Sequence, residues 1–389
     1  MIRGRPALLC FTAVAMCIAN ASRAGVWGTD PVLGLSSDYS TNPGLLYIDH
    51  TAETHAALLI DVPTTYVADA VKFSVLPSFR ISNSSGYSSL ASDYEHLTLI
   101  GEFDTERSTL TATGQLARDS SLYYNYYFNG STGVRRDSAL ADLNWVRALT
   151  ERWNLNVDVD STRVQYGHSI TYTTLTDYRY SSAAPSISWS ANERSSFSLQ
   201  AGIGDYNSLD GLTRSINSNV QLGFKRQLDE LWNLSASAGV SRETDKIKTF
   251  FGPFDSTADG TVFAANVTRQ GERLAVSGQA SRSLVPSGYA FLSRQDTYQL
   301  SASYPTSERW TFNGHVRWLR AENPQLLAPT IDQSYLELGL SAVWLFTEHW
   351  TATFMASYVT DKVSPPPTHV DASGFSIQLA RHFNHIAWH

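Results

Sequence analysis

Apolar and polar residues alternate with a period of two over stretches of about ten residues along most of this chain. In the stretch that begins at Trp153, Leu155, Val157 and Val159 are apolar and the residues between them are polar. The stretches that begin at Phe197 and Trp310 repeat this pattern. Such alternation predicts β-strands with one apolar and one polar face. Strands of soluble sandwiches are usually about 5–6 residues long, whereas about ten residues is the length of a tilted strand that crosses a bilayer.

A short polar pattern precedes many of these strands. It reads Thr-Glu-Arg-Trp at 150–153, Asp-Glu-Leu-Trp at 229–232, Ser-Glu-Arg-Trp at 307–310 and Thr-Glu-His-Trp at 347–350. With weaker copies included, it recurs roughly every 40 residues, which is typical of a repeated supersecondary unit. An aromatic residue at the strand entrance fits the aromatic belt of a membrane interface; the alternative is a Trp that begins a core strand in a soluble repeat protein. The expected interface aromatics are Trp145, Trp153, Trp232, Trp310, Trp344 and Trp350.

The pattern predicts an all-β fold: a single antiparallel transmembrane barrel of about 18 strands, with 16 as the alternative. Short connections such as 150–152 and 347–349 alternate with long ones at 242–258, 283–293 and 321–331. This asymmetry is typical of short periplasmic turns and long extracellular loops. We expect 63–70 to be a periplasmic connection as well. The expected strands span 32–40, 55–62, 71–81, 95–103, 107–118, 138–148, 153–166, 178–191, 196–206, 214–225, 231–241, 259–268, 272–282, 294–304, 310–320, 333–345, 350–360 and 373–383.

The first 24 residues have the composition of a secretory signal peptide. Arg3 and Arg5 precede an apolar stretch at 7–19, and Ser22-Arg23-Ala24 is a small-x-small cleavage signal, with Ala19-Asn20-Ala21 as the alternative. Cys17 offers a lipoprotein alternative, although the bulky Met16 before it disfavours a lipobox. The predicted organisation is therefore a signal peptide at 1–24, a periplasmic lead at 25–31, the barrel at 32–383 and a C-terminal tail at 384–389.

The mature chain has no cysteine, because Cys10 and Cys17 both lie in the signal peptide. We therefore expect no disulfides, no cysteine-based zinc site and no cysteine nucleophile. Removal of the three signal arginines leaves 26 basic and 36 acidic residues, a net charge of −10 that disfavours a nucleic-acid partner. No apolar run of 18 residues follows the signal. A chain that spans a bilayer without such a run must close into a barrel, since only helices and barrels satisfy the backbone in lipid.

Two segments resemble those of known outer-membrane proteins. The opening strand and its loop, with Asp38, Tyr39, Asn42 and Leu45, together with the Glu-x-Trp turns, resemble the outer-membrane β-barrel proteins encoded near exopolysaccharide production and export systems of Gram-negative bacteria. This resemblance implies the barrel fold and a location in the bacterial outer membrane. The last strand alternates toward Phe383, which is similar to the terminal strand recognised by the barrel assembly machinery, although Arg381 departs from that pattern and six residues follow Phe383.

Charged residues on the polar faces are expected to line the lumen, since a charge at the lipid midplane would cost roughly 2–4 kcal/mol. They could set the selectivity of a hydrated channel, or they could form ion pairs that stiffen the wall. The predicted lumen residues are Lys72, Arg80, Asp158, Asp160, Arg163, His315, Arg317 and Glu337.

Three other chemistries are weaker alternatives. His168 and Ser169, with Asp177 and Asp205, offer the parts of a hydrolase at the barrel rim, but no spacing motif joins them. His382, His385 and His389 could bind a metal only on a helix, which the pattern does not predict. Aromatics of the outer half could stack on sugars or could simply pack the loops; they are Tyr123, Tyr124, Tyr126, Tyr127, Phe128, Tyr172, Tyr178 and Tyr180.

The sequence thus predicts a non-enzymatic barrel without cofactor or metal. We expect it to be a pore or export conduit for polar solutes such as saccharides or exopolysaccharide. The alternatives are a non-conducting accessory barrel of a surface-polymer assembly and, third, a rim hydrolase. The expected partners are outer-membrane lipid, the barrel assembly machinery and a saccharide polymer or export-complex proteins.

Overall fold

The computed structural model describes residues 25–45, 51–83, 93–120, 134–167, 175–249, 252–322, 332–364 and 367–388. The predicted signal peptide, the aromatic segment 123–128 and Tyr172 lie outside the described residues. Across the described ranges, no helix is long and apolar enough to cross a membrane.

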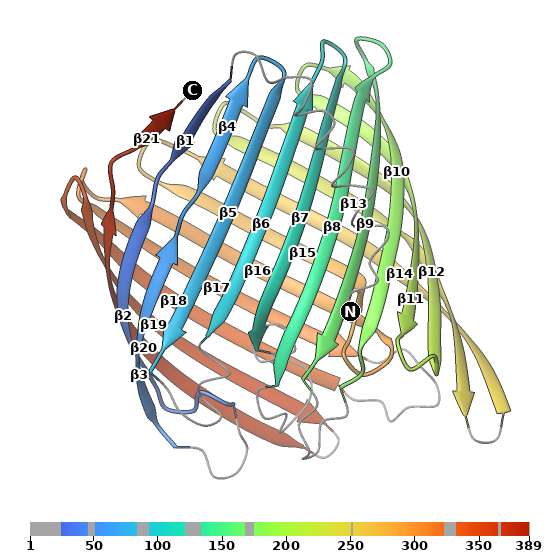
Figure 1. Ribbon diagram of the computed structural model, residues 1–389. Coiled ribbons are helices and arrows are strands. Elements are labelled where there is room, and N and C mark those ends of the chain that lie inside the picture. The colour runs from blue at the N-terminus through green and yellow to red at the C-terminus, as the bar shows by residue number, and fades with distance from the viewer. Residues whose placement is uncertain are drawn as a thin grey trace.

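All strands belong to one antiparallel sheet that closes on itself where β2 pairs with β20 (Figure 1). The strands are β1 (Val26–Thr29), β2 (Val32–Ser40), β3 (Glu53–Asp61), β4 (Thr64–Ala68), β5 (Val71–Ser82), β6 (Tyr94–Asp104), β7 (Ser108–Ser120), β8 (Arg135–Ala148), β9 (Trp153–Tyr166), β10 (Tyr178–Asn192), β11 (Ser195–Ser208), β12 (Thr213–Gln227), β13 (Trp232–Thr249), β14 (Gly252–Gln270), β15 (Ala275–Pro286), β16 (Leu292–Pro305), β17 (Trp310–Glu322), β18 (Asp332–Thr347), β19 (Trp350–Ser364), β20 (Thr368–His382) and β21 (Ile386–Trp388).

These 21 segments form 18 barrel strands, because three of the strands are interrupted near the same end of the barrel. β1 and β2 are separated by Asp30-Pro31, and β3 and β4 by Val62-Pro63. Proline lacks the amide hydrogen that a sheet ladder needs, so each proline ends one segment. Backbone bonds bridge the gaps, from Asp30 N to Pro63 O (3.1 Å) and from Phe383 N to Pro31 O (3.0 Å). The predicted all-β barrel of 18 strands is confirmed.

Three short strands lie in segments for which the sequence predicted no strand. The predicted lead 25–31 contains β1, the predicted tail 384–389 contains β21, and the predicted connection 63–70 contains β4. β1 pairs with both β4 and β21, so the two ends of the chain lie in one ladder beyond the membrane-length strands. Their short length hid these segments from a search for ten-residue alternation.

The repeated turn owes its sequence to one hydrogen-bond arrangement. In three of the four copies, the side-chain oxygen three residues before the Trp accepts the backbone amide of that Trp: Thr150 Oγ1 at 3.1 Å, Asp229 Oδ1 at 2.8 Å and Ser307 Oγ at 3.2 Å. In the fourth copy, Thr347 Oγ1 accepts the amide of His349 at 3.3 Å. Short Ser, Thr and Asp side chains favour such turns because they reach the backbone two or three residues ahead. The Thr/Ser/Asp-Glu-x-Trp pattern is therefore the signature of a tight hairpin turn.

The outer face of the barrel carries an apolar band. Its centre includes Leu222 (69 % exposed), Val240 (64 %) and Leu340 (69 %), which only a surrounding lipid phase would cover. The aromatics gather at the short-turn end, where the rings of Trp310 and Trp344 stack 5.4 Å apart. Trp145, Trp153, Trp232 and Trp350 have the same outward side-chain parity near those turns. The guanidinium of Arg381 lies 5.8 Å above Trp350 and 4.9 Å from the Phe383 ring, so cation–π contact accommodates this charge beside the belt.

The apolar band ends at outward-facing ion pairs on the long-loop side. On β13 the band runs from Trp232 to Val240, and Arg242 beyond it pairs with Asp259 at 2.8 Å. Short turns are periplasmic in such barrels and long loops are extracellular, so this charged level faces the cell exterior. The other pairs are Arg118–Asp137, Arg214–Asp205, Arg282–Asp296 and Arg320–Asp332.

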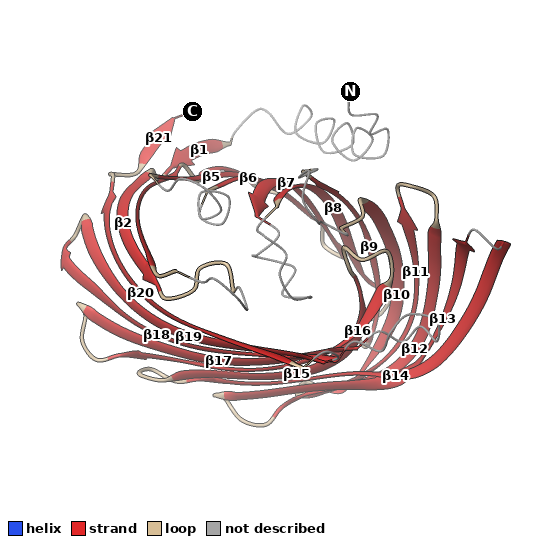
Figure 2. Ribbon diagram, turned by 90° about the horizontal axis from the view of Figure 1, so that it is seen from below, coloured by secondary structure: helices blue, strands red, loops and turns tan. Residues whose placement is uncertain are grey.

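The predicted long connection 242–258 is wrong. β13 and β14 continue through most of it as a paired hairpin that projects past its neighbours (Figure 1). β14 pairs with β15 only from Phe263 onward, so its extracellular part has no β15 partner. The tip of the β15–β16 hairpin instead turns into the barrel, where the Tyr206 hydroxyl donates to Ser287 O at 3.3 Å. Figure 2 shows the resulting flattened cross-section. β16 lies close to β10, and β11–β14 lie on the outer side of this contact.

Candidate functional site: the lumen wall

Strand alternation decides which predicted lumen residues face inward. Seven of the eight have the parity opposite to that of the outer apolar band: Lys72, Arg80, Asp158, Asp160, His315, Arg317 and Glu337. Arg163 is the exception. It shares its parity with Trp153 and Val159 and therefore lies on the outer face of β9, so its prediction as a lumen residue is wrong.

One wall of the lumen is acidic. Asp158 and Asp160 of β9 face inward beside Asp142 of β8, because the register pairs Asp142 directly with Asp160. Asn156 donates to Asp158 at 2.6 Å, and Asn144 donates to Asp158 as well. Ser182 of β10 donates to Asp160. These amides and hydroxyls hold the carboxylates in place without neutralising their charge.

The wall formed by β16–β18 carries charges of both signs. His315 Nε2 lies 3.3 Å from Glu337 Oε1, and Arg317 pairs in register with Glu337. Amide and hydroxyl side chains surround them in a hollow of about 690 Å³, among them Gln299 and Asn313. This wall therefore has one acidic residue, Glu337, and two basic residues, Arg317 and His315.

The two walls present their charges at the same height. Asp158 and Asp160 lie five and seven residues beyond Trp153, and His315 and Arg317 lie five and seven residues beyond Trp310. Both Trp residues belong to the periplasmic belt, and β8–β9 and β16–β18 form facing sides of the barrel (Figure 2). The geometry produces a field across the lumen, from the β16–β18 wall to the β8–β9 wall.

A third inward cluster lies on β2, β5 and β20. Asp38 Oδ2 accepts Arg80 Nη2 at 2.5 Å, and Asp38 also accepts Ser36 (2.9 Å) and Ser376 (2.6 Å). Lys72 pairs in register with Glu102 nearer the periplasmic end. Arg80 of β5 is therefore ion-paired to the first strand of the barrel, and the Ser376 hydrogen bond to the same carboxylate joins that strand to the last one.

Two inward turns narrow the extracellular mouth. Leu45, which follows β2, and Tyr289, at the tip of the β15–β16 hairpin, pack on an inner apolar cluster that includes Leu319 and Tyr335. Each turn contains a non-glycine residue in the left-handed region, Leu45 with φ 48° and Ala290 with φ 65°. Such a conformation costs roughly 1–2 kcal/mol, and strain of this kind is concentrated where function requires it.

A buried ion pair fixes the outer part of β7 and β8. Arg136 donates to both oxygens of Asp119 at 2.8 and 2.9 Å, and His96 Nε2 lies 3.3 Å from the same carboxylate. Both members of the pair are buried. The sequence analysis missed this pair and Asp142, although the hairpin register from the 150–152 turn places Asp142 opposite Asp160.

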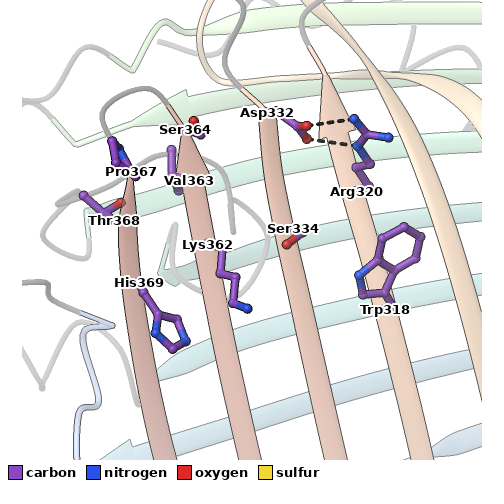
Figure 3. A pocket seen from close by; sticks show the side chains of 10 residues that line it. All are labelled: Trp318, Arg320, Asp332, Ser334, Lys362, Val363, Ser364, Pro367, Thr368 and His369. Carbon is purple, nitrogen blue, oxygen red and sulfur yellow. Dashed lines mark hydrogen bonds and ion pairs between the residues drawn. The ribbon is translucent and has the colours of Figure 1, made fainter.

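Another hollow, of about 650 Å³, lies on the outside of the barrel (Figure 3). Trp318, Arg320, Lys362 and His369 line it with outward parity, and Arg320 is held by Asp332 at 2.7 Å. It lies at the level of the outward-facing ion pairs, above the apolar band. This hollow faces the outer leaflet and not the lumen.

The described residues of the hydrolase and metal alternatives contact other groups. Asp205 forms an exterior ion pair with Arg214 at 2.9 Å, and Asp177 accepts the amide of Tyr166 at 2.8 Å. His168 and Ser169 lie outside the described residues. His382 contacts Thr351 (3.1 Å) and His385 contacts Asp30 (2.8 Å). Within the described ranges, no three His, Cys, Asp or Glu side chains gather closely enough to hold a metal ion.

The strand number, the closure and the outer apolar band define a class: this is an 18-stranded membrane-spanning barrel of the bacterial outer-membrane type. No protein-family model matches the sequence, and no curated protein matches it either. Among solved structures, Pseudomonas aeruginosa OccK2 (OpdF) in complex with glucuronate has a TM-score of 0.49 at 11 % identity, over 92 % of this chain and 98 % of that chain. Acinetobacter baumannii OccAB3 has a TM-score of 0.46 at 13 % identity, over 93 % and 99 %. The ferric citrate transporter FecA has a TM-score of 0.47 at 12 % identity, over 86 % of this chain and 60 % of that chain.

Proposed function

We propose that this barrel is a channel through which small polar solutes cross the outer membrane, with saccharides as the favoured class. The observation that carries the proposal is the charge arrangement of the lumen at one height, acidic on β8–β9 and basic on β17. Charged groups that line a pore set which ions and polar solutes enter it. A field across the lumen orients a dipolar solute as it passes.

Saccharides are favoured by the side chains around Arg317. Gln299, Asn313 and Ser301 line the same hollow and offer both donors and acceptors to hydroxyl groups. The resemblance to barrels encoded near exopolysaccharide systems points in the same direction. Export of a polymer is a narrower form of this proposal, and it needs the mouth at Leu45 and Tyr289 to widen.

The second candidate is a non-conducting barrel that serves a surface-polymer assembly. The packing of Leu45 and Tyr289 on the inner wall favours it, because apolar contacts across the mouth reduce the open cross-section. The partner in this case is a component of the export complex.

Single-channel recording from refolded protein in a planar bilayer separates the two candidates. Stable current steps that an oligosaccharide blocks support the channel. Silence from protein whose heat-modifiable gel mobility shows it to be folded supports the accessory barrel.

The lumen charges make a further prediction for a conducting protein. The double variant Asp158→Asn, Asp160→Asn should shift the reversal potential in a salt gradient toward anions, and Arg317→Gln should shift it toward cations. Asp259→Asn removes an acidic residue from the outer face and is the matched control, for which we expect no shift. Equal reversal potentials in all four proteins contradict the assignment of these residues to the pathway.

A further inference from the structure

A four-residue polar patch lies on the inner face of the extracellular part of β12 and β13. Ser215 pairs in register with Asp245, and Asn217 pairs with Glu243. Because alternate residues share a face, all four side chains point to the same side of the sheet. Directly opposite residues have Cβ atoms about 4.5–5.5 Å apart, so the four side chains can reach one common point.

The patch is buried, and several of its oxygen atoms lack a hydrogen-bond partner. Glu243 and Asp245 are each 1 % exposed, and Ser215 is 0 % exposed. Among the described residues, no hydrogen-bond donor reaches either carboxylate oxygen of Glu243, which has the acid Asp245 beside it, and Asn217 Oδ1 and Ser215 Oγ have no partner. A buried carboxylate without a partner is strongly unfavourable. Because four such oxygens gather in one place, they indicate a missing positively charged group.

The groups around Glu243 act on it in opposite directions. Glu243 lies beyond Arg242, outside the membrane-spanning part of β13; burial and the adjacent Asp245 raise its pKa to about 8. Arg294 of β16 opposes this rise. Tyr180 of β10 is hydrogen-bonded to Asn217. At Glu243, burial and the second acid therefore outweigh the nearby arginine.

The chemistry of the donors selects the ligand. All of them are oxygens, from two carboxylates, one amide and one hydroxyl, and no His or Cys is among them. Ca²⁺ takes 6–8 such oxygens in flexible geometry, whereas Zn²⁺ favours nitrogen and sulfur, and Mg²⁺ demands a near-ideal octahedron and retains its waters. We propose that Glu243, Asp245, Asn217 and Ser215 form a calcium site on the inner face of the β12–β13 hairpin, with water completing the coordination.

The position of the site gives it a structural role. β14 has no β15 partner above Phe263, so in this part of the sheet the projecting hairpin is paired with its neighbours only through the β12–β13 ladder among the described residues. A cation that joins β12 to β13 strengthens the ladder on which the hairpin depends. The site does not depend on the proposed channel function, because it binds whether or not the lumen conducts.

Binding can be measured on full-length refolded protein treated with chelator. Tb³⁺ luminescence sensitised by nearby tyrosines such as Tyr180, and its displacement by Ca²⁺, reports occupancy. We expect Glu243→Gln to weaken Ca²⁺ binding at least about tenfold, because one charged ligand is lost. The matched control is Asp361→Asn, since Asp361 is also a buried inward carboxylate but accepts two bonds of 2.8 Å from Gln333; its affinity should equal that of the wild type.

The unfolding temperature provides a second readout. Ca²⁺ should raise it in the wild type and in Asp361→Asn but not in Glu243→Gln. Without Ca²⁺, Glu243→Gln should match or exceed the wild type, because the variant has no buried acid to ionise, so misfolding does not obscure the result. Equal Ca²⁺ affinity in Glu243→Gln and wild type, or no Ca²⁺ binding by the wild type, overturns the proposal.

Discussion

Replacement of Arg136 by leucine is expected to lower the free energy of unfolding by about 3–5 kcal/mol. Arg136 donates two hydrogen bonds to Asp119, and both groups are buried at the outer end of β7 and β8. Leucine removes the positive charge and leaves the carboxylate in a poorly hydrated place with only His96 beside it. The cost is mainly that of the orphaned charge and not of the lost bonds themselves.

Urea unfolding in lipid vesicles, followed by tryptophan fluorescence, measures this change. Arg242→Leu is the matched control, because Arg242 makes the same two-pronged contact with Asp259, at 2.8 and 3.3 Å, but both side chains are about two-thirds exposed. Exposed ion pairs contribute little, so no measurable change is expected there. A loss of similar size in both variants contradicts the view that burial determines the effect.

Removal of the two apolar contacts at the mouth should produce the largest functional change. The double variant Leu45→Gly, Tyr289→Gly deletes the side chains that reach the inner cluster around Leu319 and Tyr335. We expect the single-channel conductance to rise severalfold and the block by oligosaccharide to weaken, because the mouth becomes wider. If the wild type is silent, the double variant is expected to conduct.

Ala290→Gly is the control for this pair. Glycine adopts positive φ without the steric cost that alanine incurs at φ 65°, and it leaves Tyr289 in place. This variant should gain roughly 1 kcal/mol of stability at unchanged conductance. Equal conductance in the wild type, the double variant and Ala290→Gly would falsify the claim that these two turns narrow the mouth.

The strands of the membrane level could be predicted because lipid and water impose opposite preferences on alternate residues. β2 and β9, for example, begin and end where the alternation does. The prediction failed above the band on β13, where the outward residues Arg242 and Lys246 are as polar as the inward Glu243 and Asp245. Because both faces of the strand are polar there, apolar and polar residues do not alternate. The sequence pattern therefore predicts a loop where the structure has a paired strand.

Lumen-facing residues could be predicted only where the alternation of faces along each strand decided the assignment. Arg163 was assigned inward for its charge, although it lies five residues from Asp158, on the opposite face of β9. Asp119, Arg136 and Glu243 became recognisable only through burial, which depends on tertiary packing. Single-sequence alternation contains no information on that packing.

The chain closes its barrel by joining its first and last strands, and this sets the order in which the protein can be built. Asp38 of β2 accepts a hydrogen bond from Ser376, 338 residues later, and Asp30 contacts His385 across 355 residues. Until β20 has paired with both β2 and β19, these two strands are unpaired edges that can join other chains. Such distant pairing also folds slowly. A barrel without its last strand is thus an open sheet with two exposed edges, and it remains prone to aggregation until β20 closes it.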